Sequence, residues 1–163
     1  MRYIIARKSL MHSEIRSENN TVLGVIDFKI LDKHFAKLHT ESGHNYGIES
    51  SSTFGFDFKL KEGNVTLDEI KVKIKWFSLY NSVTITTIIG TEYTINWSGF
   101  VNGKMSVLNK DNKEAAIISW KGIDVRNIKE WVLEIIDSDS ELNTEEMIML
   151  ISYCFIAGIG ITP

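Results

Sequence analysis

The chain has almost no cysteine and almost no proline. Its 163 residues include one cysteine, Cys154, so an internal disulfide and a metal site built from several cysteines are both excluded. A lack of disulfides is typical of a reducing compartment, and we therefore expect a cytoplasmic protein. The one proline is Pro163. The turns must then be made by glycine, asparagine, aspartate and serine, which occur in short clusters along the chain.

Long apolar runs are also missing. The N-terminal segment has four apolar residues between charged ones, Tyr3 to Ala6, whereas a secretory signal needs about 7–15, so we predict no signal peptide. The longest apolar run, Met147 to Ile161, has 15 residues and is interrupted by Ser152 and two glycines. A membrane-spanning helix needs about 20. We therefore favour a buried segment over a transmembrane tail, and peripheral association with a membrane stays open.

The motifs of catalysis and cofactor binding are absent as well. The sequence contains no Gly-x-Ser-x-Gly nucleophile motif, no glycine-rich phosphate loop and no His-Glu-x-x-His zinc motif. No acid–base pair or activated nucleophile can be argued from the spacing of the polar residues. The sequence therefore predicts neither an enzyme nor a bound cofactor.

Two weaker patterns bear on metal binding. Three histidines are spaced by five between positions 34 and 44, which does not gather ligands on strands. Acidic residues alternate in segment 137–141, as at the start of a calcium-binding loop. Such a loop also needs a glycine and a final carboxylate, where this chain has Leu142 and Ile148. We predict surface histidines, a solvated acidic loop and no metal site.

What the sequence does contain is a series of short apolar segments. About twelve of them follow one another, separated by polar turns at the roughly 8–12 residue intervals of an all-β sandwich or barrel. In Phe54–Lys61 and Ile70–Trp76, apolar and polar residues alternate, as in a strand with one buried face. Three similar strand–turn–strand units recur, with turns around 17–20, 41–43 and 109–113. An internal repeat and the ordinary recurrence of hairpins both account for them.

The C-terminal segment is the one that has the composition of a helix. Asn143 is a candidate N-cap, and Glu146 stands three residues later, where a capping-box partner is expected. The following residues are apolar on every side, so the helix must be buried. A barrel of twelve strands is wide enough to enclose one helix.

We therefore predict one mainly β domain over residues 1–163. It consists of a closed antiparallel barrel of about twelve strands over 1–137, an acidic loop over 137–143 and a buried central helix over 144–160.

This layout resembles the tubby C-terminal-like superfamily, which includes plant LURP-one-related proteins, phospholipid scramblases and small bacterial members. The three recurring hairpins look like the strand–turn–strand units of that superfamily. Residues 131–137 and 147–159 are similar to the closing strand and buried helix of the small bacterial members. The resemblance implies a closed twelve-stranded barrel and a non-enzymatic role at membranes, because tubby domains bind phosphoinositides through basic residues and scramblases act on lipid. No basic residue of the family's lipid site is matched to a position in this chain.

Five lysines are the candidate binding residues. Lys71, Lys73 and Lys75 share one face of a predicted strand, and Lys59 and Lys61 share a face of the strand before it. Together they could form a basic patch for anionic phospholipid headgroups. A solvated outer face, or lysines that protect an edge strand, would produce the same alternation.

The net charge of −3 argues against nucleic acid as a partner. We therefore predict a non-enzymatic intracellular binding module that associates with anionic phospholipid or a membrane surface through the lysine face. The alternative is a soluble scaffold for interaction with a protein partner.

Overall fold

The computed structural model describes residues 1–29, 32–50, 57–73, 82–87, 89–96, 103–120, 129–136, 142 and 144–159. These residues form twelve strands and one helix. The strands are β1 (Arg2–Arg7), β2 (His12–Ser17), β3 (Val22–Lys29), β4 (Asp32–Thr40), β5 (Asn45–Ser50), β6 (Asp57–Glu62), β7 (Val65–Lys73), β8 (Ser82–Thr87), β9 (Glu92–Asn96), β10 (Lys104–Asn109), β11 (Glu114–Ser119) and β12 (Glu130–Ile135). The helix is α1 (Glu145–Ile159).

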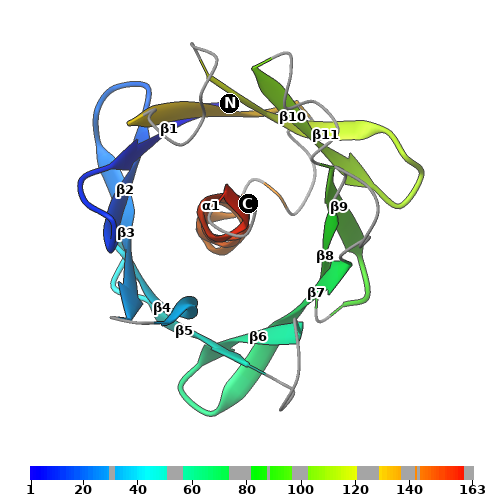
Figure 1. Cartoon of the computed structure of the whole chain (residues 1–163), viewed down its shortest axis with the longest axis horizontal. Helices are drawn as coiled ribbons and strands as arrows, with labels where there is room; N and C mark the ends of the chain where they lie inside the picture. The colour runs from blue at the N-terminus through cyan, green and yellow to red at the C-terminus, as the bar shows by residue number, and fades with distance from the viewer. Residues whose placement is uncertain are drawn as a thin grey trace.

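The strands form a closed antiparallel barrel in which each pairs with its neighbours in sequence. The first strand closes the ring against the last, with Ile5 of β1 opposite Trp131 of β12. Figure 1 shows the ring of strands with α1 inside it. The predicted fold class is therefore confirmed. Period-two alternation is consistent with it, because such strands present a mainly apolar side to the interior and a mainly polar side outward.

The helix fills the interior of the barrel. Every residue from Met147 to Ile156 is at most 5% exposed. Its aromatic side chains pack against aromatic residues of the barrel wall: Tyr153 stacks on Phe28 with ring centres 5.8 Å apart, and Phe155 meets Trp131 edge-on at 5.4 Å. A helix that is apolar all round thus has apolar partners all round, which removes the need for a lipid environment.

The start of the helix differs from the prediction. The Thr144 hydroxyl accepts a hydrogen bond from the backbone N–H of Met147 at 3.3 Å, so Thr144 is the N-cap of α1. The assignment of Asn143 as the cap, with Glu146 as its capping-box partner, was wrong by one residue. Asn143 itself lies outside the described residues. Either residue type can accept the exposed amides of a first turn, so the sequence did not discriminate between them.

Four hairpin turns repeat one set of hydrogen bonds. In each turn the side chain of the first residue accepts the backbone N–H of the fifth, at distances of 3.0 to 3.3 Å. The fourth residue is asparagine or glycine with a positive φ of 58° to 95°, the conformation that these two residue types tolerate best. The four turns are 17–21, 40–44, 87–91 and 109–113. The three hairpins predicted from the recurring pattern are confirmed, and the turn 87–91 adds a fourth.

All four turns lie at one end of the barrel. Each follows an even-numbered strand, and in an antiparallel ring those connections share one end. The start of α1 lies at that end too, because Ser42 in the turn 40–44 bonds to Glu145. This arrangement places the acidic first turn of the helix beside a hairpin turn.

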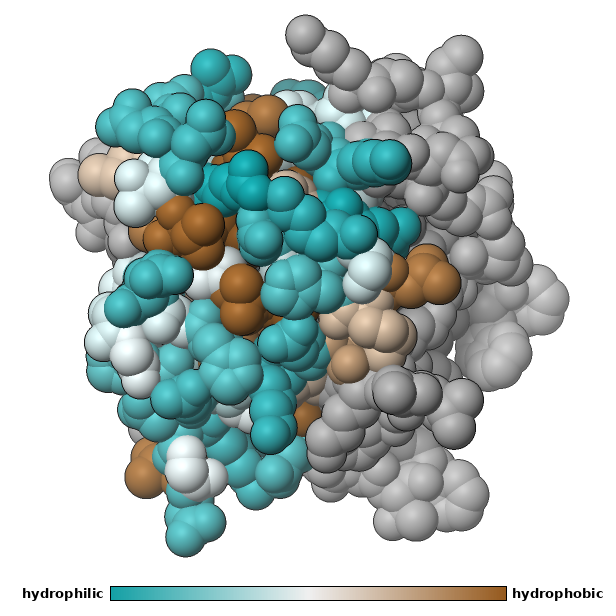
Figure 2. Space-filling model, turned by 90° about the vertical axis from the view of Figure 1, so that its left-hand side faces the viewer, coloured by the Kyte–Doolittle hydropathy of each residue, from teal (hydrophilic) through white to brown (hydrophobic). Residues whose placement is uncertain are grey.

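The side of the barrel that bears β2 and β3 has a mainly hydrophilic surface (Figure 2). Figure 2 shows the side on which β2 and β3 lie, with hydrophilic side chains in the majority and hydrophobic ones scattered among them. Among the described helical residues, no stretch has the length and hydropathy that a membrane-spanning helix requires.

Candidate binding surface

The structure places β6 between β5 and β7, and this brings lysines and carboxylates side by side. In the backbone register Lys59 lies opposite Glu49 of β5 on one side and opposite Glu69 of β7 on the other. The neighbours of Lys59 on its own strand, Phe58 and Leu60, are buried in the barrel. Strand alternation therefore directs Lys59 outward, as the sequence predicted.

Both described lysine side chains of this face are close to carboxylates. The Nζ atom of Lys61 lies 2.8 Å from Oε2 of Glu49, and the Nζ atom of Lys59 lies 3.8 Å from Oε1 of Glu69. All four side chains are between 31% and 55% exposed, so these are solvent-screened surface pairs. The described part of the lysine face is thus a surface of interleaved charges and not a continuous basic patch.

The remaining three predicted lysines are placed in part. The backbone register sets position 71 opposite Asp57 on β6 and Thr84 on β8, and position 73 opposite Ser82. Lys75 lies outside the described residues. Because β6 and β7 each have neighbours on both sides, protection of an edge strand does not explain the lysines.

The same interleaving of charges occurs elsewhere on the outer surface. Arg2 lies 3.6 Å from Glu134 and 3.7 Å from Glu18, and Lys104 lies 3.4 Å from Glu114. These pairs join neighbouring strands or the ends of hairpins. Charge pairing across strands is therefore general in the described part of the barrel, and the pairs of the lysine face are two examples of it.

Ser152 and Cys154 of α1 are two candidate chemical groups that lie buried inside the barrel. The Ser152 hydroxyl donates to the carbonyl oxygen of Ile148, one helical turn earlier, at 2.7 Å. Burial raises the pKa of the Cys154 thiol, and the carboxylate of Asp68 acts in the same direction, so the reactive thiolate is disfavoured. The interpretation of Cys154 as a small core residue is confirmed by its 3% exposure.

Sequence interpretation missed two charged residues that contact the core. Asp68 is 3% exposed and stands in register with Leu60 and Thr87, both buried. Arg7 places its guanidinium 5.5 Å from the centre of the buried ring of Trp131, and burial lowers the pKa of Arg7. The strand period could have identified both residues, because residues two apart lie on the same face of a strand. Asp68 is two residues before the apolar Ile70, and Arg7 is two residues after the apolar Ile5.

The predictions on metal binding have a limited test. Within the ranges that the structure describes, no group of three or more histidine, cysteine, aspartate or glutamate side chains is placed to hold a metal ion. The acidic segment 137–141 lies outside those ranges. His39 and His44 point to different partners, the side-chain oxygen of Asn45 and the carboxylate of Glu62.

Comparison of the chain with family models, with curated proteins and with solved structures finds no match in any of the three. The resemblance to the tubby C-terminal-like superfamily therefore stays a prediction, which the barrel and its central helix neither identify nor contradict.

Proposed function

We propose that this protein is a non-enzymatic binding module that acts through the outer surface of its barrel. The observation that carries the proposal is the filling of the interior: α1 occupies the space in which many barrels hold a ligand, and its residues from Met147 to Ile156 are buried. Binding would then depend on the outer face of the strands and on the loops.

For the ligand we propose an anionic phospholipid surface, in contact with the lysine face of β6 and β7. An exposed ion pair is worth about 0–1 kcal/mol, and a lysine near an anionic membrane gains about 1 kcal/mol. For each lysine, the free energy lost by leaving Glu69 or Glu49 is therefore about equal to the free energy gained by contact with lipid phosphate groups. The glutamates oppose the approach of the membrane, so we expect weak, salt-sensitive association.

Sedimentation with phosphatidylcholine vesicles, with and without phosphatidylserine, tests this proposal. We expect binding only with phosphatidylserine. The double variant Lys59→Glu/Lys61→Glu should lose it, and Glu49→Gln/Glu69→Gln should bind more tightly because the repulsive carboxylates are gone. Lys104→Glu/Lys113→Glu is a matched control with the same change in charge on β10 and the turn after it. Equal binding by all variants, or none by any, would reject the lysine face as a lipid site.

A protein partner is the second candidate function, and the ion pairs of the lysine face favour it. A surface on which cations and carboxylates alternate complements a partner of mixed charge better than a uniformly anionic sheet of lipid. Stable association with a purified protein, without any dependence on lipid and with sensitivity to both pairs of charge variants, would support this alternative. If neither the lysine variants nor the glutamate variants change the association, the lysine face is not the surface that binds the protein partner.

A further inference from the structure

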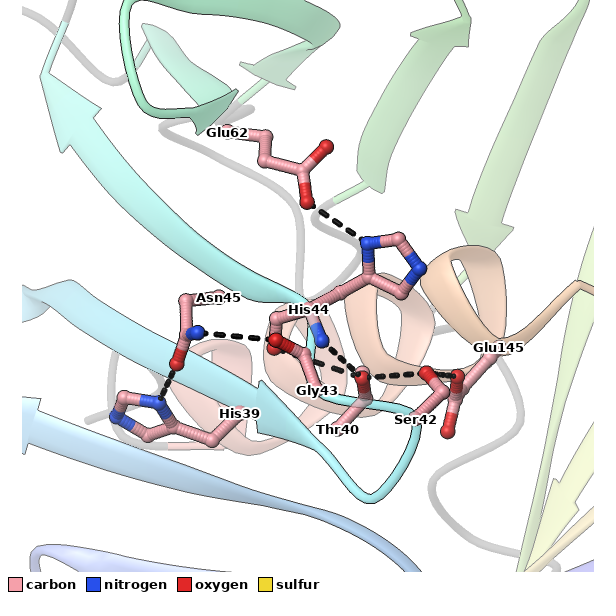
Figure 3. Close-up of polar contacts among 8 residues, drawn as sticks. All are labelled: His39, Thr40, Ser42, Gly43, His44, Asn45, Glu62 and Glu145. Atoms are coloured by element: carbon pink, nitrogen blue, oxygen red, sulfur yellow. Dashed lines mark hydrogen bonds and ion pairs between the residues drawn. The ribbon is translucent and has the colours of Figure 1, made fainter.

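The turn between β4 and β5 contacts both the barrel rim and the helix. Figure 3 shows the Ser42 hydroxyl directed at the carboxylate of Glu145 in the first turn of α1, and the His44 ring directed at Glu62 on β6. The His44 Nδ1 atom lies 2.8 Å from Oε1 of Glu62. Thr40 connects the Ser42–Glu145 contact with the His44–Glu62 contact, because its hydroxyl oxygen accepts the backbone N–H of His44 and lies 2.8 Å from the Ser42 hydroxyl.

The four repeated turns show that this histidine is not needed for the turn itself. The fifth position, which supplies only a backbone N–H to the first side chain, is held by Thr21, His44, Thr91 and Lys113 in the four turns. The third position, where Ser42 stands, is equally variable, with asparagine, isoleucine or aspartate in the other turns. Hairpin geometry therefore does not dictate the residue types at positions 42 and 44, and in this turn their side chains make the additional contacts with Glu145 and Glu62.

The charges around His44 favour its protonated form. The bonded carboxylate of Glu62 raises the pKa of the imidazole above its ordinary value, and Glu145 and Glu146 of α1 act in the same direction from farther away. The ring also stacks on Tyr46 of β5, with ring centres 5.9 Å apart. Burial, followed by the charges of Glu146, Glu62 and Glu145, raises the pKa of Tyr46 to about 12, so Tyr46 stays neutral. Of these five residues, His44, Tyr46, Glu62, Glu145 and Glu146, only His44 can carry a positive charge.

We propose that the turn 40–44 is a pH-dependent clasp on the start of the central helix. With His44 protonated, its charge lies among Glu62, Glu145 and Glu146 and offsets their mutual repulsion, so the turn, β6 and the first turn of α1 are held together. Loss of the proton leaves three carboxylates at the barrel end without this compensation, and the first helical turn opens more often. The deeper turns of α1 stay in the barrel, held by apolar packing.

The sign follows from the raised pKa. A group whose pKa is higher in the folded protein stabilises it fully below the ordinary value and loses that effect as the pH rises through the raised value. The clasp is therefore closed in mildly acidic solution and loosens toward alkaline pH. The ordinary histidine pKa is about 6.5, so the change begins near that pH and is completed above it.

Hydrogen exchange followed by NMR tests the clasp. The amides of Met147 and Ile148 report the first turn, because both donate to Thr144. Their protection factors, corrected for intrinsic exchange rates, should fall roughly two- to fivefold as His44 loses its proton, the size expected of exposed charge pairs. The amide of Tyr153, deep in the helix, should keep its protection. The midpoint should coincide with the titration of the His44 ring carbon signals.

Variants separate the clasp from a general effect of pH. His44→Gln should abolish the step, and Glu62→Gln should move its midpoint to lower pH. His39→Gln is the matched control, because His39 lies in the same hairpin and bonds to Asn45 and not to a carboxylate. If His44→Gln does not fold, the shift in Glu62→Gln decides. Constant protection across the range, a step that persists in His44→Gln, or an unmoved midpoint in Glu62→Gln would overturn the proposal.

Discussion

The interior of the barrel and the lysine face are two sides of the same strands. They differ in burial, because side chains on the inner side are packed in the core and those on the outer side reach solvent. On β6, Phe58 and Leu60 are 5% and 0% exposed and belong to the core around the helix. Lys59 and Lys61, on the same strand, have their amino groups at the surface beside glutamates. One strand thus carries two faces with different physical roles.

The difference teaches where stability and function can reside. Removal of a buried side chain costs transfer free energy and leaves a cavity, whereas loss of an exposed charge pair costs about 1 kcal/mol or less. The outer face can therefore change without loss of the fold, and the interior cannot. This is why the proposed binding surface and the pH-dependent clasp both lie where the side chains reach solvent.

The largest expected effect is loss of the helix. Deletion of residues 144–163 removes the filling of the lumen and leaves the inner faces of twelve strands without packing partners. We expect a chain that is unfolded or aggregates. Thermal unfolding followed by circular dichroism checks this, and an intact cooperative transition in the truncated chain would show that the barrel does not need its helix.

Within the helix, Phe155 should be among the most sensitive positions. The centre of its ring lies 5.4 Å from that of Trp131 and 6.3 Å from that of Trp120, and its side chain is fully buried. Phe155→Ala should lower the free energy of unfolding by roughly 3–5 kcal/mol, measured by urea denaturation. Leu10→Ala, at a position 84% exposed, is the control and should change it by no more than about 0.5 kcal/mol. Similar costs for both would contradict a packed lumen.

Two strand glycines, Gly24 of β3 and Gly47 of β5, provide a finer comparison. A Cβ atom at Gly24 would lie 2.4 Å from the carbonyl oxygen of His39 and 3.0 Å from the Met149 side chain, whereas at Gly47 it would meet no atom within 4 Å. Gly24→Ala should cost about 1–3 kcal/mol of unfolding free energy, mainly because the backbones of β3 and β4 must move apart, while the Met149 side chain of α1 must also shift. Gly47→Ala should leave it unchanged or slightly higher. Equal effects in urea denaturation would mean that the His39 carbonyl oxygen and the Met149 side chain do not approach Gly24 this closely.

The smallest expected effect is on the lysine face. Lys61→Gln removes the pair with Glu49, whose side chains are 31% and 55% exposed. We expect the free energy of unfolding to fall by less than about 1 kcal/mol, and the difference from the unmodified chain to shrink in high salt. A larger, salt-independent loss would indicate that Lys61 supports the fold and is not available for binding.

Much of the fold was predictable because its signals are local. The strand period of two placed Phe58 and Leu60 inward and Lys59 and Lys61 outward, and the length of the apolar C-terminal run favoured burial in protein. The N-cap was missed by one residue, because Asn143 and Thr144 are both good caps. The candidate site was only partly predictable. Alternation identified the lysines, but the sequence of their own strand did not indicate that Glu49 and Glu69 of the neighbouring strands lie beside them.

The sequence by itself determined that this chain makes short strands, that they bury one face, and that its last segment is an apolar helix. These properties follow from the period and composition of adjacent residues. Only the tertiary structure decided that Lys61 meets Glu49, twelve positions away, and that Ser42 meets Glu145, 103 positions away. Such contacts depend on register and on closure of the ring, which are set by the packing of the whole chain and by no single segment.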